Sequence, residues 1–169
     1  MNVTGSDVAL VLIGVFYVFA GVVSMRAAAT SIILDAAIAA IEGRPDAAST
    51  SSRERLLVVL GVSVLAAGAA LALRLELAAA LFSAALVLQV VYLSLLAPLW
   101  LDKHDPPSPS GRSQTFNAAV VFAFATAFVL WAYASGRLLP MSAVPPILLG
   151  LTVIAVVVFV VHALWRVRP

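Results

Sequence analysis

Residues 56–100 read LLVVLGVSVLAAGAALALRLELAAALFSAALVLQVVYLSLLAPLW, and this stretch decides the fold. As a single helix it would be about 65 Å long, roughly twice the thickness of the hydrocarbon core of a bilayer. It must therefore fold back on itself. The charged residues inside it are Arg74 and Glu76, so the reversal is predicted there, at a membrane interface. The stretch thus predicts two antiparallel spans joined by a tight turn.

The composition of the whole chain also indicates that most of the protein lies in lipid. Hydrophobic residues make up 63% of the sequence, charged residues 11%, and the mean hydropathy is +1.11. A soluble domain needs about a quarter of its residues charged to cover its surface. The lipid bilayer is therefore the predicted main partner. The predominance of Arg over Lys, with abundant Ala and Val, favours a bacterial inner membrane, in which the protein is multi-pass.

Outward from the hairpin, three more stretches reach the length that a membrane-spanning helix needs, about 20 residues. The predicted spans are residues 8–25, 56–73, 77–100, 117–135 and 145–165. We therefore predict an all-α, polytopic transmembrane bundle of about five spans that forms one membrane domain over residues 1–169.

The segment after the first span decides whether the count is five or six. Residues 26–41 are rich in Ala and prone to form a helix, which we interpret as an interfacial helix or as a cytoplasmic extension of the first span. A re-entrant or short sixth span is the alternative, but about 15 residues with Asp35 near the middle are poor material for crossing. Residues 42–55 are predicted to be a flexible loop, with Ser52 as the N-cap of the next span.

A second long loop is predicted over residues 102–115. It contains three prolines and a glycine, which disfavour regular structure. Ser113 or Thr115 is the predicted N-cap of the fourth span.

The distribution of basic residues gives the spans an orientation. Positively charged residues in short loops remain in the cytoplasm. In the five-span topology eight of the ten Lys and Arg residues fall on one side, and Arg74 and Arg137 fall on the other. The eight are Arg26, Arg44, Arg53, Arg55, Lys103, Arg112, Arg166 and Arg168. The predicted topology is therefore N-terminus outside and C-terminus in the cytoplasm.

Small residues mark the predicted helix-packing faces. Gly14 and Gly21 lie seven residues apart in the first span, and Gly61 and Gly68 have the same spacing in the second. Such stripes let helices approach closely in lipid. We interpret them mainly as intramolecular contacts, with a dimer interface as the alternative.

One polar cluster is predicted at mid-membrane depth. Gln89 lies near the middle of the third span, Tyr92 follows one turn later, and Tyr17 lies at a similar depth in the first span. An amide in hydrocarbon needs a partner, so these three side chains are predicted to meet. The main interpretation is a structural hydrogen bond between helices. The alternative is the lining of a site for a small ligand or a quinone headgroup.

Several kinds of chemistry are disfavoured by the residues present. The chain has no cysteine and only His104 and His162, so disulfides, thiolate ligands and a bis-histidine haem are not expected. Asp102, His104 and Asp105 form a weak metal motif without a fourth ligand, and we predict no metal and no cofactor. The small net charge of +2 gives no support for nucleic-acid binding.

These observations lead to a ranked expectation of function. The first is a non-enzymatic accessory or structural subunit that packs in a larger membrane complex or forms homo-oligomers. The second is a small carrier or channel for an apolar or weakly polar solute passing near Gln89. The third is an enzyme acting on a lipid or a quinone, which is disfavoured because no acid or base is predicted at mid-depth.

Overall fold

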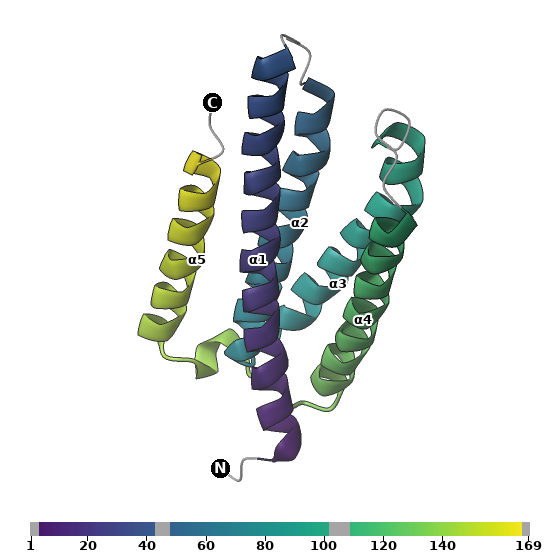
Figure 1. The fold of residues 1–169 in the computed structure, drawn as a ribbon. Helices are drawn as coiled ribbons and strands as arrows, with labels where there is room; N and C mark the ends of the chain where they lie inside the picture. Colours follow the sequence, from purple (N-terminus) through teal and green to yellow (C-terminus); the bar gives the residue numbers. More distant parts are fainter. Residues whose placement is uncertain (1–3, 43–47, 102–108, 167–169) are drawn as a thin grey trace.

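The computed structural model describes residues 4–42, 48–101 and 109–166, and within these ranges it contains helices and turns but no strand. About 90% of the structure is helical. Successive long helices run in alternating directions, so the start of α1 and the end of α5 lie at opposite ends of the bundle (Figure 1). The elements are α1 (Gly5–Glu42), α2 (Ala48–Ala72), α3 (Leu77–Val91), η1 (Tyr92–Leu101), α4 (Pro109–Ala134), η2 (Met141–Ala143) and α5 (Pro146–Arg166).

The helices have the length and composition of a membrane protein. Among the described residues, three helical segments are long and apolar enough to cross a bilayer, namely Gly5–Ile38, Leu77–Leu99 and Ser113–Ala134. Two shorter apolar helices accompany them, Leu56–Ala72 and Pro146–His162. The all-helical fold predicted from the sequence is thus confirmed.

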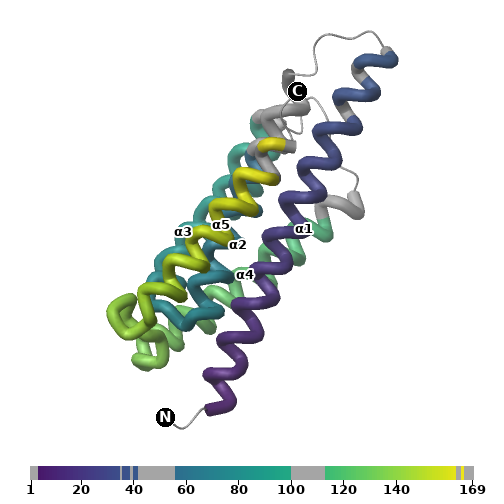
Figure 2. Tube along the Cα trace, turned by 90° about the vertical axis from the view of Figure 1, so that its left-hand side faces the viewer, coloured from purple at the N-terminus to yellow at the C-terminus, as the bar shows by residue number. Residues whose placement is uncertain are grey.

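Helix α1 is one continuous element of 38 residues. Its length is about 57 Å, well beyond the roughly 30 Å of a hydrocarbon core. Both views show it as the longest element of the bundle (Figures 1 and 2). Residues 26–41 therefore extend the first helix and do not form a separate interfacial one. The physical reason is their high Ala content and the absence of Gly and Pro before Gly43.

Two predicted loop boundaries were wrong. Residues 48–55 already belong to α2, and residues 109–115 already belong to α4. Ser52, Ser113 and Thr115 therefore lie inside helices and are not N-caps. Ser and Thr are tolerated in a helical turn, and a proline such as Pro109 suits the first turn, where its missing amide proton is not needed. The remaining parts of the two loops, 43–47 and 102–108, lie outside the described residues.

Glycines bring α1 and α2 into close contact along their length. A Cβ on Gly14 would lie 2.7 Å from the Cα of Ala72, and a Cβ on Gly68 would lie 2.6 Å from the backbone nitrogen of Val18. About two turns after Gly14 in α1, Gly21 faces the backbone of Leu65 in α2. Gly61 completes the interface. All four glycines thus lie at an intramolecular helix contact, which is the most extensive in the bundle.

The predicted reversal between α2 and α3 is confirmed. Arg74 adopts a left-handed conformation with φ +56°. Its amide donates to the carbonyl of Leu71 at 2.8 Å, and the amide of Leu75 donates to the carbonyl of Ala70 at 2.9 Å. This pair of bonds is the Schellman ending of a helix, in which glycine is the usual left-handed residue. An arginine in that position indicates that interactions of its side chain favour it there over glycine.

The third predicted span is helical throughout but changes its winding. Regular α-helix gives way at Tyr92 to a π-helix that continues to Leu101 and contains Pro98. Proline has no amide proton and its ring clashes with the carbonyl four residues earlier, so a wider turn relieves the conflict. The fifth predicted span, residues 145–165, agrees with α5 to within one residue at each end.

Candidate functional site

A cleft separates the pair α1 and α2 from the pair α3 and α4. The two pairs lie close together near the α2–α3 turn and diverge toward the other end of the bundle (Figure 1). Between them is a cavity of about 660 Å³. It is lined by Ser24, Ala27, Ala28, Ser31, Leu57, Leu60, Gly61, Val64, Gln89, Tyr92, Gln114, Thr115 and Ala118. None of these side chains is charged, so the cleft is apolar with polar groups at a few points.

Gln89 is the most informative of the lining residues. Its side-chain oxygen Oε1 is buried and accepts no hydrogen bond from any residue that the structure describes. Tyr92 lies one turn further along and is almost fully buried, with 6% of its surface exposed. An unsatisfied amide oxygen beside a cavity costs free energy, about 1–3 kcal/mol, unless a donor fills the space. Because Oε1 is shielded from solvent, a rotation of the Gln89 side chain would present this acceptor to a molecule in the cleft that carries an N–H or O–H group.

Tyr17 is not among the residues that line this cleft. Its ring lies 5.4 Å from that of Phe82 and 5.2 Å from that of Phe122, in both cases edge to face. Phe82 and Phe122 are themselves stacked, with their centroids 5.3 Å apart. The structure thus brings Gln89 and Tyr92 to one cavity and places Tyr17 in an aromatic cluster with Phe82 and Phe122.

The aromatic cluster closes the narrow end of the cleft. Tyr17 precedes Ser24 by seven residues in α1, and Phe82 precedes Gln89 by seven residues in α3. Seven residues are about two helical turns, so each ring lies on the same face as its cleft residue and about 10 Å closer to the α2–α3 turn. Phe82 is completely buried. The three rings therefore form an apolar floor beneath the polar groups of the cleft.

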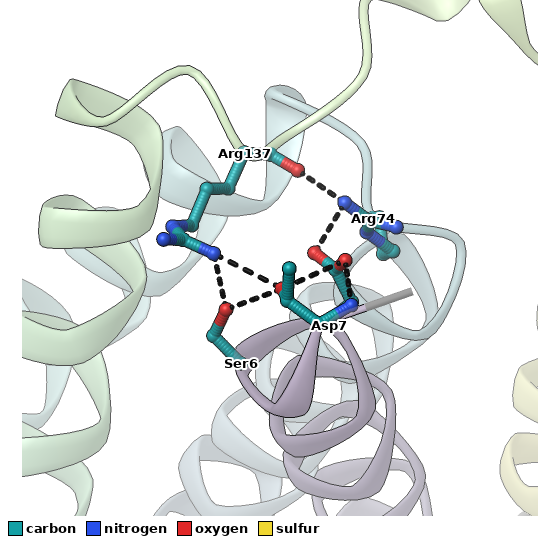
Figure 3. Close-up of polar contacts among 5 residues, drawn as sticks. Ser6, Asp7, Arg74 and Arg137 are labelled. Carbon is teal, nitrogen blue, oxygen red and sulfur yellow. Dashed lines mark hydrogen bonds and ion pairs between the residues drawn. The ribbon is translucent and has the colours of Figure 1, made fainter. Parts of the chain in front are cut away.

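Beyond this floor, a polar network ties the beginning of α1 to two turns (Figure 3). The guanidinium of Arg74 forms an ion pair with the carboxylate of Asp7, with 2.7 Å between Nη2 and Oδ1. The backbone amide and the hydroxyl of Thr4 each donate to Asp7 Oδ2 at 2.9 Å. The pair is largely shielded from solvent, because the two side chains are 20% and 12% exposed. Asp7, at the third position of α1, thus binds the N-cap residue Thr4 as in a capping box and holds the α2–α3 turn at the same time.

Arg137, in the connection after α4, joins the same network. Its Nη1 donates to the hydroxyl oxygens of Ser6 and Thr4, the latter at 3.1 Å. Its carbonyl accepts a hydrogen bond of 2.8 Å from Arg74 Nη2 (Figure 3). Its guanidinium carbon lies 5.2 Å from the centre of the Trp131 ring, a cation–π geometry. Three separate segments of the chain therefore meet at this end.

The backbone adds a second connection between these turns. The amide of Glu76 donates to the carbonyl of Leu139 at 3.0 Å, and the amide of Leu139 donates to the carbonyl of Arg74 at 2.6 Å. The turn after α2 and the connection after α4 are thus hydrogen-bonded side by side. From the sequence, Arg74 located the hairpin and, together with Arg137, oriented the chain, but this network was not predicted. The signal was present, because the predicted alternation put Asp7, Arg74 and Arg137 at the same end of the bundle.

Metal-binding residues do not converge in the part of the chain that the structure describes, where no group of three or more His, Asp or Glu side chains could hold an ion. The weak motif of Asp102, His104 and Asp105 lies outside the described residues. No family model matches the chain, and no curated protein or solved structure is significantly similar to it. Function is therefore inferred from the cleft, its aromatic floor and the polar network.

Proposed function

We propose that this protein is a bacterial inner-membrane protein that crosses the bilayer five times, with its N-terminus outside and its C-terminus in the cytoplasm. The alternating directions of α1 to α5 and the concentration of basic residues at one end support this topology. The shorter apolar helices, Leu56–Ala72 and Pro146–His162, serve as the second and fifth spans. Each is about 26 Å long, and a small mismatch with the hydrocarbon thickness can be met by local thinning of the bilayer.

Within this topology the protein acts as a small, non-enzymatic carrier that binds a weakly polar solute in the cleft. The observation that carries this proposal is the buried, unpartnered oxygen of Gln89 beside a cavity of about 660 Å³. Among the described residues that line the cleft there is no His, Asp, Glu, Lys or Arg side chain that could perform catalysis. The expected solute is mainly apolar and carries at least one hydrogen-bond donor for Gln89.

The layering of the bundle supports a carrier because access to the cleft is one-sided. In the proposed orientation the cleft opens toward the cytoplasm, the rings of Tyr17, Phe82 and Phe122 form its floor, and the ion pair of Asp7 and Arg74 closes the outer end. A carrier must keep one side closed while the other is open. The described arrangement has the features of the state that is open to the cytoplasm.

An accessory subunit of a larger complex is the second candidate, and α5 is the observation that favours it. This helix contacts α1 and α2 sparsely. It also exposes a continuous apolar stripe at spacings of three and four residues, formed by Ile147, Leu151, Ile154, Val158, Val161 and Trp165. Lipid or a helix of another subunit can cover such a stripe. Isolation in native nanodiscs separates the two candidates: a stoichiometric partner favours the accessory role, and an isolated protein or homo-oligomer favours the carrier.

Binding in the cleft can be tested with a matched pair of solutes. Ala118 lines the cleft, so an Ala118→Cys variant in nanodiscs reports on occupancy through its rate of labelling by a charged thiol reagent. Benzyl alcohol and toluene have similar shapes, but only the alcohol can donate a hydrogen bond. We expect benzyl alcohol to slow labelling more than toluene does.

The role of Gln89 is tested by repeating the comparison in the Gln89→Leu background. This substitution removes the acceptor while keeping a side chain of similar size, so the advantage of benzyl alcohol should disappear. If the two solutes protect equally in both backgrounds, the proposed polar site is wrong. Unchanged thermal unfolding of the Gln89→Leu variant is the control for folding.

A further inference from the structure

A second groove runs along the opposite side of α1, where α5 packs against α1 and α2. Its larger part has a volume of about 460 Å³ and is almost entirely apolar, with Val18, Ala155 and Phe159 among its lining residues. Its smaller part has a volume of about 330 Å³, and Arg26, Thr30 and His162 line it together with apolar residues. Phe159 lines both parts, so they are adjacent. Together they form a groove with an apolar tail and a basic head.

The basic head has a cation available for binding. The guanidinium of Arg26 forms no ion pair or hydrogen bond with any residue that the structure describes, and none of the described residues that line this part of the groove is acidic. His162 adds a second nitrogen-containing side chain from α5. The hydroxyl of Thr30 donates to the carbonyl of Arg26 at 2.9 Å, so the positive charge for a ligand comes from Arg26 and not from Thr30. An anion is the ligand that this head recognises.

The order of the two parts matches the depth profile of a lipid leaflet. Arg26 follows Val18 by eight residues in α1, which is about 12 Å along the helix. His162 lies four residues before the end of α5. The end of α5 lies on the side of the bundle toward which α1 runs (Figure 2). In the proposed topology the basic head lies at the cytoplasmic interface and the apolar part extends toward the membrane centre. An apolar helix in the groove would leave Arg26 without an anion.

We infer that this groove binds one anionic glycerophospholipid, with its phosphate between Arg26 and His162 and one acyl chain alongside Phe159 in the apolar part. The lipid would fill the space that the sparse contacts of α5 leave and would tie this helix to α1. The inference is independent of the solute cleft, since helical spacing puts Arg26 and the cleft residue Ala27 on different faces of α1. Failure of one proposal therefore leaves the other standing.

The inference is tested by native mass spectrometry of the full chain, after delipidation in detergent, with added phosphatidylglycerol or phosphatidylcholine of identical acyl chains. We expect saturable binding of one phosphatidylglycerol per chain, with an affinity at least about fivefold above that for phosphatidylcholine. Arg26→Gln should abolish this preference, and Arg26→Lys should retain most of it. Equal binding of the two lipids, or a preference that survives Arg26→Gln, would overturn the inference.

The acyl-chain part of the groove is tested by a matched pair of substitutions in α5. Ala155→Phe fills the apolar part, whereas Val153→Phe adds a ring at a position outside its lining, where the side chain is 60% exposed. We expect Ala155→Phe to lose phosphatidylglycerol binding and Val153→Phe to bind like the parent chain. Inorganic phosphate is the last control: if it competes at concentrations similar to those of the lipid, the groove is a simple anion site and the lipid proposal fails.

Discussion

Arg74 in the α2–α3 turn and Asp7 in the first turn of α1 form an ion pair, with 2.7 Å between Nη2 and Oδ1. Arg74 holds a left-handed conformation that costs an L-residue about 1–2 kcal/mol compared with glycine. The charge-assisted bonds to Asp7 and to the carbonyl of Arg137 offset that cost. The arginine thus takes a position that suits glycine because its side chain joins three segments at one end of the bundle.

Replacing the carboxylate of Asp7 should show that the conformation of Arg74 depends on their ion pair. We expect Asp7→Asn to lower the free energy of unfolding, because Arg74 is left with a partly shielded charge and no counter-ion. Unfolding in detergent with increasing sodium dodecyl sulfate measures the effect. Glu76→Gln is the matched control, since Glu76 is exposed in the same turn and should change little.

A double substitution separates the ion pair from backbone strain. In Asp7→Asn combined with Arg74→Gly, the unpaired charge is gone and glycine relieves the left-handed turn. The double variant should therefore be more stable than Asp7→Asn alone. A double variant that loses stability additively would show that the two residues act independently.

The glycine contacts between α1 and α2 predict a sharp difference between two Gly→Ala substitutions. Gly14→Ala would place a methyl group 2.7 Å from the Cα of Ala72. Because backbone atoms cannot rotate away as a side chain can, we expect the free energy of unfolding to fall by about 1–3 kcal/mol. Gly150→Ala meets nothing within 4 Å and should be neutral or stabilising by about 0.5–1 kcal/mol. The same unfolding measurement decides. Equal effects at the two positions would contradict the close α1–α2 contact.

The connection after α4 predicts a conformational cost without a steric one. Gly136 has φ +64°, and no atom lies within 4 Å of the place where its Cβ would be. Gly136→Ala should therefore lower stability by about 1 kcal/mol through its backbone conformation alone. Gly136→Asn should cost less, because asparagine tolerates the left-handed region. If Gly136→Asn lowered the free energy of unfolding more than Gly136→Ala does, crowding by the side chain and not the backbone conformation would be the cause.

The aromatic floor of the cleft predicts the effect of removing one ring. Phe82 is completely buried between Tyr17 and Phe122, so Phe82→Ala should lower the free energy of unfolding by about 3–5 kcal/mol. Phe124 is 74% exposed on α4, and Phe124→Ala should change it by less than about 1 kcal/mol. Similar losses from both variants would show that Phe82 is not the centre of the core.

Much of the fold was predictable because it depends on local properties of the sequence. Length and apolarity located all five long helices, and the charges at Arg74 and Glu76 located the hairpin. The seven-residue glycine spacing pointed to helix contacts, and these glycines lie between α1 and α2. Each of these inferences uses residues that are close together in the chain.

The features that could not be predicted depend on helix tilt and on contacts between residues far apart in the chain. The divergence of α2 from α3 creates the cleft, and no local pattern encodes that angle. Tyr17 was matched to Gln89 by depth alone, but packing against Phe82 and Phe122 decides where its ring lies. Helix starts at Ala48 and Pro109 were missed because Ser, Thr and Pro were interpreted as loop residues when they also occur in first turns.

Side-specific labelling tests the proposed cleft and topology together, and the absence of native cysteine leaves no background. Ala118→Cys lies in the cleft, Val120→Cys lies two residues away on the opposite face of α4, and Met141→Cys lies 53% exposed at the other end of the bundle. A membrane-impermeant thiol reagent should label Met141→Cys in intact cells, Ala118→Cys only in inverted vesicles, and Val120→Cys in neither. Labelling of Ala118→Cys in intact cells, or its protection in both preparations, would contradict a water-filled cleft that opens to the cytoplasm.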